Sequence, residues 1–318
     1  MTLSVALQMD PLDGIDLDGD SSFALGLEAQ RRGHKLWHYL VTAMSYQDGA
    51  LTARGHDLAL RREVGNHFTH GAEEVRALDG FDVILMRQDP PFDMQYIWAT
   101  HHLEAIHPKT LVVNNPREVR NAPEKLFVTE FRDFMPPTLI SRDPKTITAF
   151  RDEHKDIVVK PLFGNGGAGI FHLKPDDENL SALLEGHLEQ SREPLMVQRY
   201  LPAIKEGDKR IILVDGKPIG GINRIPAKGE ARANLHVGGR AAPVELTKRE
   251  HEMCEALGPE LKKRGLIFVG IDSIGDMLTE INVTSPTGLQ ELGRFNGTVG
   301  TDKAPEALIW DAIEAHLS

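Results

Sequence analysis

A glycine-rich segment, KPLFGNGGAGIF, spans residues 160–171 and restricts what this chain can fold into. Four of the six residues from 164 to 169 are glycine, and glycine adopts backbone conformations with positive φ that other residues avoid. Lys160 ends an apolar run just before the glycines, and the apolar residues IFHL follow them. This pattern predicts two strands joined by a glycine-rich turn.

Three kinds of nucleotide site contain a glycine run of this type. Gly164, Gly166 and Gly169 satisfy the dinucleotide pattern G-x-G-x-x-G, but that pattern requires a helix after the glycines. A phosphate-binding P-loop requires a G-K-[ST] ending, which is absent here. A hairpin whose backbone N–H groups cover phosphate oxygens remains, with Lys160 supplying a positive charge. The alternative is a surface hairpin with a solvated lysine.

A second segment, residues 270–288, predicts two strands joined by a tight turn at Gly275-Asp276. Glu280 and Asn282 are two residues apart, so they share one face of their strand. Asp272 joins that face only if the loop has an odd number of residues, because a two-residue turn would point it away. Two carboxylates and an amide oxygen on one face would suit magnesium. The alternative is that these acidic residues are solvated, although an unpaired carboxylate inside the apolar run LTEINV is costly.

Basic residues stand near the start of two further predicted strands. Arg210 follows Asp208 and Lys209 at the start of one, and Arg224 lies on the next. Arginine binds phosphate and carboxylate groups through paired hydrogen bonds, although any single arginine here could form an ordinary surface ion pair. The chain has a net charge of -11, which argues against a general nucleic-acid or anionic-membrane surface. Phosphate binding would therefore need a local cluster of basic residues.

The length of 318 residues predicts two or three domains. Strand and helix signals alternate over residues 1–120, which predicts an open parallel sheet. The expected strands are 4–9, 34–40, 81–87 and 110–115, and the expected helices are 20–33 and 94–106. The single cysteine excludes an internal disulfide. Because there is no signal-peptide pattern and no apolar run near 18 residues, we expect a soluble, cytoplasmic protein.

The acidic stretch DLDGD at residues 16–20 imitates a calcium-binding loop. Such a loop requires a glycine where Ser21 stands and a glutamate where Leu27 stands. We therefore predict no calcium site there.

The same residues, taken in order, resemble the ATP-grasp ligases, and within them the bacterial glutathione synthetases. The resemblance covers nearly the whole chain. The blocks that carry it are DSSFALGLEAQRRG, VILMRQDPPFD, APEKLF, KPLFGNGGAGIF, QRYLPAIKEGDKRIILVDG, RIPAKGEARANLHVGGR and GLIFVGIDSIGDMLTEINVTSPTG. It implies an α/β fold, α+β in its C-terminal part. The implied domains are an N-terminal open parallel sheet domain (1–122), a central ATP-grasp subdomain (123–200) and a C-terminal ATP-grasp subdomain (201–318) with a mobile loop (226–241).

The resemblance also implies an activity. A bacterial glutathione synthetase joins gamma-glutamylcysteine to glycine through an acyl phosphate, giving glutathione, ADP and phosphate. ATP would be the co-substrate, two magnesium ions (or manganese) would assist, and the protein would be a homotetramer. The alternatives are another ATP-grasp carboxylate–amine ligase with a different acid or amine, or a nucleotide-binding regulatory protein without catalysis.

The resemblance assigns roles to particular residues. Arg210 and Arg224 would be catalytic, and Asp272, Glu280 and Asn282 would bind the metal. The nucleotide would be bound by Lys125, Lys160, Gly164, Asn165, Gly166, Gly167, Gly169, Gln198, Tyr200, Leu201, Asp208 and Arg210. The other substrates would be bound by Arg224, Arg232, Asn234, Gly238, Gly239, Ser285, Pro286 and Thr287.

Two positions depart from the family pattern. Phe163 stands where relatives carry aspartate or another polar residue, and Gly288 stands where one relative carries a cysteine. The blocks around Ser21, Ser22, Asp89 and Pro90 are expected to help bind the dipeptide, without individual roles.

Overall fold

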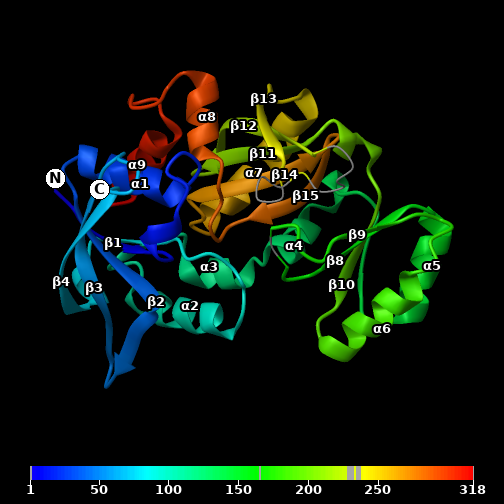
Figure 1. Cartoon of the computed structure of the whole chain (residues 1–318), viewed down its shortest axis with the longest axis horizontal. Helices are drawn as coiled ribbons and strands as arrows, with labels where there is room; N and C mark the ends of the chain where they lie inside the picture. Colours follow the sequence, from blue (N-terminus) through cyan, green and yellow to red (C-terminus); the bar gives the residue numbers. More distant parts are fainter. Residues whose placement is uncertain (1, 165, 228–232, 234–237, 318) are drawn as a thin grey trace.

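The computed structural model describes residues 2–164, 166–227, 233 and 238–317. Over these residues the chain forms three sheets, which Figure 1 shows as an N-terminal domain on the left, a small helix-backed sheet on the right and a third sheet between them. No helix within the described ranges is long and apolar enough to span a membrane.

The N-terminal sheet has six strands in the order β4-β3-β2-β1-β5-β6. The strands are β1 (Ser4–Gln8), β2 (Lys35–Gln47), β3 (Ala50–Leu60), β4 (Phe68–Ala77), β5 (Val83–Met86) and β6 (Leu111–Val113). The predicted parallel sheet is confirmed for β2, β1, β5 and β6, whereas β3 and β4 add an antiparallel extension that was not predicted. Strand β4 is exposed along most of its length, so it carries little of the apolar alternation that marks a strand.

Four helices accompany this sheet and lead to the next domain. They are α1 (Ser21–Arg31), α2 (Met94–Ile106), α3 (Pro116–Asn121) and α4 (Glu124–Phe127). Asp20 caps α1, because its carboxylate accepts a hydrogen bond of 2.6 Å from the Phe23 N–H. The helix predicted over residues 20–33 is confirmed, because α1 ends at Arg31, Arg32 is its C-cap, and Gly33 terminates it with a φ of +81°.

The second sheet is antiparallel, in the order β7-β10-β8-β9. Its strands are β7 (Thr138–Ser141), β8 (Ile157–Pro161), β9 (Phe171–Leu173) and β10 (Leu195–Arg199). The helices α5 (Pro144–His154) and α6 (Leu180–Gln190) cover one face, where Val159 and Val197 are buried. Strands β8 and β9 form the hairpin predicted around the glycine-rich segment.

The third sheet has five strands in the order β13-β12-β11-β14-β15, all antiparallel. Its strands are β11 (Asp208–Val214), β12 (Lys217–Ile225), β13 (Arg240–Pro243), β14 (Phe268–Ile274) and β15 (Met277–Asn282). On one face, Ile211 and Ile271 share a core with Leu257 of α7 (Lys248–Lys263). On the other face, Ile212 and Phe268 share a core with residues of α8 (Leu289–Asn296) and α9 (Pro305–His316).

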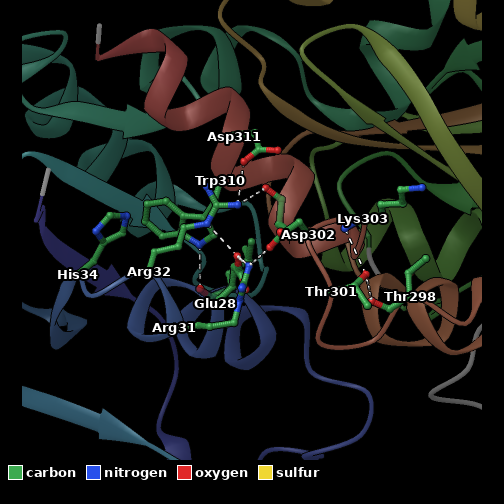
Figure 2. Close-up of polar contacts among 12 residues, drawn as sticks. Glu28, Arg31, Arg32, His34, Thr298, Thr301, Asp302, Lys303, Trp310 and Asp311 are labelled. Atoms are coloured by element: carbon green, nitrogen blue, oxygen red, sulfur yellow. Dashed lines mark hydrogen bonds and ion pairs between the residues drawn. The ribbon is translucent and has the colours of Figure 1, made fainter.

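A cluster of charged side chains ties α9 to α1 (Figure 2). The buried carboxylate of Glu28 accepts hydrogen bonds from Arg31 and Arg32 at 2.7–2.8 Å. Arg32 reaches across to Asp311 of α9 at 2.8 Å, as Figure 2 shows. It also lies 2.9 Å from Glu314 of the same helix. The Trp310 indole N–H donates to the Leu25 carbonyl at 2.9 Å. The C-terminal helix therefore anchors α1, and α1 has its first residues in the cavity described below.

Glu28→Gln tests this anchor. Burial pushes the pKa of Glu28 up, but Arg31 and Arg32 outweigh it and hold the pKa below its ordinary value of 4.5. We expect Glu28→Gln to lower the free energy of unfolding by about 2 kcal/mol at neutral pH. Because a depressed pKa stabilises the fold only while the carboxylate is ionised, the difference from wild type should shrink as the pH falls below 4.5.

Denaturant unfolding at several pH values measures the difference. Asp302→Asn is the matched control, because Asp302 pairs with the same Arg31 but its side chain is 89% exposed. That control should change stability by less than about 0.5 kcal/mol. Equal losses for the two variants would contradict the role assigned to Glu28.

Candidate active site

A cavity of about 860 Å³ is lined by loops and a helix start of the N-terminal domain and by strands of the second and third sheets. The N-terminal domain contributes its loop at residues 10–20 and the start of α1, the second sheet contributes β8 and β10, and the third sheet contributes β11, β12, β14 and β15. A site assembled from three separate stretches of the chain can hold several ligands side by side.

The strand register of the third sheet places six polar side chains on one face. Arg224 of β12 pairs with Asp208 of β11, Arg210 pairs with Asp272 of β14, and Asp272 pairs with Glu280 of β15. Asn282 lies two residues beyond Glu280, and residues two apart in a strand share a face. All six residues line the cavity: Asp208, Arg210, Arg224, Asp272, Glu280 and Asn282.

Asp272 reaches this face in a different way from the one expected. The turn at Gly275-Asp276 has two residues, with Ile274 paired to Met277, and φ is positive at both turn positions. An odd loop length is therefore absent. Instead, a bulge shifts the register between Asp272 and Ser273 and leaves Thr279 as the extra residue. One extra residue in the strand has the same effect on side-chain direction as one in the turn.

Asp272 lies between two arginines. Arg210 donates to its two carboxylate oxygens at 2.5 and 3.1 Å, and Arg224 lies 2.9 Å from one of them. All three side chains are buried. Burial alone would raise the pKa of Asp272, but the two guanidinium groups outweigh it and hold the pKa far below its usual range. The result is a fixed, ionised carboxylate with two oriented cations.

Glu280 faces two lysines from outside its own sheet. Its Oε1 lies 3.4 Å from Lys125 Nζ of α4 and 3.8 Å from Lys160 Nζ of β8. Burial lowers the pKa of Lys160, although Glu280 opposes that shift. Burial likewise pushes the pKa of Glu280 up, but the two lysines outweigh it and leave the pKa below its usual value. Neither lysine forms a short hydrogen bond with Glu280, and Lys125 donates instead to the Gly164 carbonyl.

The glycine-rich turn has the backbone that its sequence predicted. Gly166, Gly167 and Gly169 take φ values of +59°, +81° and +69°, which disfavour residues with a side chain. The Gly164 carbonyl accepts a hydrogen bond of 2.5 Å from Lys125. Asn165 lies outside the described residues. In the described part of the turn, Gly164, Gly166 and Gly167 line the cavity, whereas Gly169 does not.

The residues assigned to adenine and ribose lie at one end of the cavity. Gln198 is buried on β10, Tyr200 and Leu201 follow that strand, and all three line the cavity. Asp208 Oδ1 is buried without a hydrogen-bond partner among the described residues. Burial raises the pKa of Asp208 to about 7, although Arg224 opposes the shift. A hydroxyl donor from a ligand would satisfy that oxygen.

Only some of the residues assigned to the other substrates line the cavity. Ser285, Pro286 and Thr287 line the cavity, where Ser285 Oγ donates to the Gln88 carbonyl at 2.6 Å. Gly238 and Gly239 are described but do not line it. Arg232 and Asn234 lie outside the described residues, as does most of the loop 226–241, so the mobility expected of this loop stays a prediction.

Sequence reasoning left several cavity residues without a role. Arg87 donates to Ser22 Oγ at 3.0 Å and to the Pro286 carbonyl at 2.9 Å. Glu124 accepts from Thr284 Oγ1 at 2.8 Å, and Glu291 lines the cavity from α8. Arg87 is the last residue of the predicted buried strand 81–87, and ligands bind at the carboxyl ends of strands in α/β sheets. Its position in the sequence could therefore have identified it as a candidate site residue.

The two departures from the family pattern lie in different places. Phe163 does not line the cavity and packs near Phe92, with ring centroids 6.2 Å apart. Gly288 lines the cavity and takes a φ of +107° just before α8.

The donor set around Glu280 suits a hard cation that also touches an anionic ligand. Among the described residues there is no group of three or more His, Cys, Asp or Glu side chains that could hold a metal by themselves. Asn282 donates from Nδ2 to the Gly270 carbonyl at 3.2 Å, which leaves its amide oxygen as the group to bind a cation. Magnesium in phosphate sites needs only one or two carboxylates, since phosphate and water oxygens supply the rest.

Comparisons with known proteins match nearly the whole chain. The family model described as "Prokaryotic glutathione synthetase, N-terminal domain" matches residues 3–120, and "Prokaryotic glutathione synthetase, ATP-grasp domain" matches residues 124–297. A glutathione synthetase of Mesorhizobium japonicum is 57% identical over 314 residues, 99% of each chain. One of Escherichia coli O127:H6 is 44% identical over 319 residues, again 99% of each chain.

Solved structures share the fold at lower identity. The D-cycloserine synthetase DcsG has a TM-score of 0.65 and 15% identity, over 99% of this chain and 100% of that one. The ATP-grasp ligase PsnB complexed with minimal precursor has a TM-score of 0.63 and 18% identity, over 100% of both chains. The fold is therefore the ATP-grasp fold.

Asp272→Asn tests the central ion pairs. It leaves two buried guanidinium groups without their shared carboxylate, so we expect the free energy of unfolding to fall by about 3–5 kcal/mol. Denaturant unfolding measures the loss. Asp215→Asn is the control, because its partner Lys262 has a side chain that is 62% exposed, and the change there should be at most about 1 kcal/mol. A loss of that small size for Asp272→Asn would contradict the structural role.

Proposed function

The chain belongs to the prokaryotic glutathione synthetase family, and we propose that its reaction takes place in the cavity between the three sheets. The protein is an ATP-dependent ligase that joins gamma-glutamylcysteine to glycine. One arrangement supports the location: in a single cavity, two arginines contact the buried carboxylate of Asp272 and two lysines face the half-buried carboxylate of Glu280.

We propose that ATP lies between the second and third sheets. Gln198, Tyr200 and Leu201 would border the adenine, and Asp208 Oδ1 would accept a hydrogen bond from a ribose hydroxyl. Lys125 and Lys160, which now face Glu280, would turn their ammonium groups to the phosphates beneath the glycine-rich turn. That exchange keeps each buried ammonium next to a negative charge.

Asp272, Glu280 and Asn282 would hold magnesium, which neutralises phosphate charge when bound. We propose two ions, for which Asp272, Glu280 and Asn282 would be the protein ligands, with phosphate and water oxygens supplying the other ligands. The protein's own residues would then orient the substrates. Phosphoryl transfer depends mainly on positioning and charge neutralisation, so no protein nucleophile is required. Consistent with this, the single cysteine, Cys254, is buried in α7.

The arginines would act on the two substrates. A free carboxylate cannot lose oxide to an amine, so the γ-phosphoryl group first moves to the dipeptide carboxylate and forms an acyl phosphate. The glycine amine then attacks the carbonyl carbon, and phosphate leaves with the electron pair of the C–O bond. Arg210 and Arg224, fixed by Asp272, would stabilise the transferring group and the oxyanion. Ser285, Pro286 and Thr287 would border the dipeptide.

Further proposals concern the whole protein. We propose the domain limits 1–122, 123–200 and 201–318, a homotetramer and a cytoplasmic location. The three sheets occupy separate stretches of the chain, with strands within 4–113, 138–199 and 208–282, which supports the domain limits.

Phosphate release tests the reaction. We expect release from ATP and magnesium only when gamma-glutamylcysteine and glycine are both present, together with tripeptide detected by mass spectrometry. Omission of each component in turn is the control, and chelation of the metal should stop the reaction. Release with the dipeptide alone would indicate a leaking acyl phosphate and a different amine, and no release in any mixture would contradict the function.

Glu280→Gln tests the metal and phosphate site. We expect the ligase activity to fall by about two orders of magnitude or more, because the change removes charge where magnesium and phosphate meet. Circular dichroism should show a folded protein. Asp276→Asn, in the turn of the same hairpin, should keep its activity. Full activity in Glu280→Gln would show that the metal assignment is wrong.

A further inference from the structure

At one end of the cavity, no residue has an individual role in the proposed function. It is lined by the loop at residues 10–20, the start of α1 and the first turn of α8. These segments belong to the N-terminal domain and to the chain after β15, whereas the adenine and ribose residues lie on or next to β10 and β11. The inference below rests on the proposed function, which leaves this end to the dipeptide.

Glu291 is the buried carboxylate at this end. Only 9% of the residue is exposed. Its Oε1 lies 3.4 Å from Arg294, whose side chain is 46% exposed, and its Oε2 is buried with no hydrogen-bond partner among the described residues. A buried ionised oxygen without a partner is costly in free energy. Burial raises the pKa of Glu291 above its usual value, although Arg294 opposes the shift.

The loop that faces Glu291 adds negative charge rather than cancelling it. Asp16 raises the pKa of Glu291 further, so the two carboxylates lie within electrostatic range of each other. The backbone at Gly19 passes between them: a Cβ there would lie 2.6 Å from Asp16 Oδ2 and 3.7 Å from Glu291 Oε1. This end therefore suits a compact cation with several N–H donors.

In the same part of the cavity, the start of α1 provides hydrogen-bond donors, which favour an anion. Ser21 Oγ accepts a hydrogen bond of 3.3 Å from the Leu289 N–H, and Ser22 Oγ accepts one of 3.0 Å from Arg87. Each hydroxyl keeps its own hydrogen for donation. The first turn of α1 also presents backbone N–H groups and a partial positive charge, of which the Phe23 N–H is already bonded to the Asp20 carboxylate. A ligand carboxylate is favoured at such a place.

A cation site beside an anion site matches a free α-amino acid group, whose ammonium and carboxylate share one carbon atom. Gamma-glutamylcysteine carries such a group at the end opposite to the carboxylate that reacts. We propose that Glu291 binds the α-ammonium group of the gamma-glutamyl residue, with its α-carboxylate at the start of α1. Glu291 thereby selects dipeptides with a free glutamyl amine, while Arg210 and Arg224 act at the other end of the same molecule.

The test pairs one change in the protein with one change in the substrate. Wild type and Glu291→Gln are compared on gamma-glutamylcysteine and on N-glutarylcysteine, which lacks only the α-amino group. We expect wild type to favour the natural dipeptide in kcat/KM by on the order of 10- to 100-fold. Glu291→Gln should lose a similar factor on gamma-glutamylcysteine and less than about threefold on N-glutarylcysteine, so the two changes should not be additive. The KM for ATP should stay unchanged.

Glu306→Gln is the matched control, because Glu306 is another carboxylate whose pKa is raised by burial but which does not line the cavity. It should leave both dipeptides unaffected. Equal losses on the two dipeptides for Glu291→Gln, or no preference in wild type, would overturn the role of Glu291. If Glu291→Gln does not fold, Glu291→Asp in the same comparison should give an intermediate preference. Failure of wild type to use gamma-glutamylcysteine at all would instead contradict the proposed function.

Discussion

The carboxylate of Asp272, held between Arg210 and Arg224, is the interaction on which the site depends. It joins three neighbouring strands, β12, β11 and β14, through side chains that are all buried. Without the carboxylate, two guanidinium groups would be buried next to each other, and without the arginines, an ionised acid would be buried alone. The three charges therefore hold one another in place, and they give the cavity two oriented guanidinium groups.

The face of the third sheet that carries Asp272 is polar at one end of its strands and apolar at the other. At the cavity end it carries the polar residues from Asp208 to Asn282, whereas further along Ile212 and Phe268 pack under α8 and α9. The apolar part gives the sheet a core on both sides, because α7 covers the opposite face. The hydrophobic contacts can therefore hold the strands in register while the polar part stays open to ligands.

The N-terminal domain completes the cavity through contacts that are distant in sequence. Glu28 and its arginines bind α9 to α1, Ser21 contacts the start of α8, and Arg87 binds the Pro286 carbonyl. These contacts place the loop at residues 10–20 over the segment that follows β15. A substrate bound there would meet groups from both ends of the chain, which lets one fold position two substrates and a nucleotide together.

The sequence by itself determined the local features. The glycines from 164 to 169 required a hairpin turn with positive φ, and the two-residue spacing of Glu280 and Asn282 required a shared face. The tertiary structure decided where those features meet. The direction of Asp272 depends on the bulge at Thr279, a register that pairing between strands sets. Strand β4 forms because it pairs with β3. Glu291 becomes a candidate binding residue because the loop at residues 10–20 brings Gly19 close to its carboxylate. Local spacing fixes the direction of a side chain, but burial and charge depend on neighbours that lie far away in the sequence.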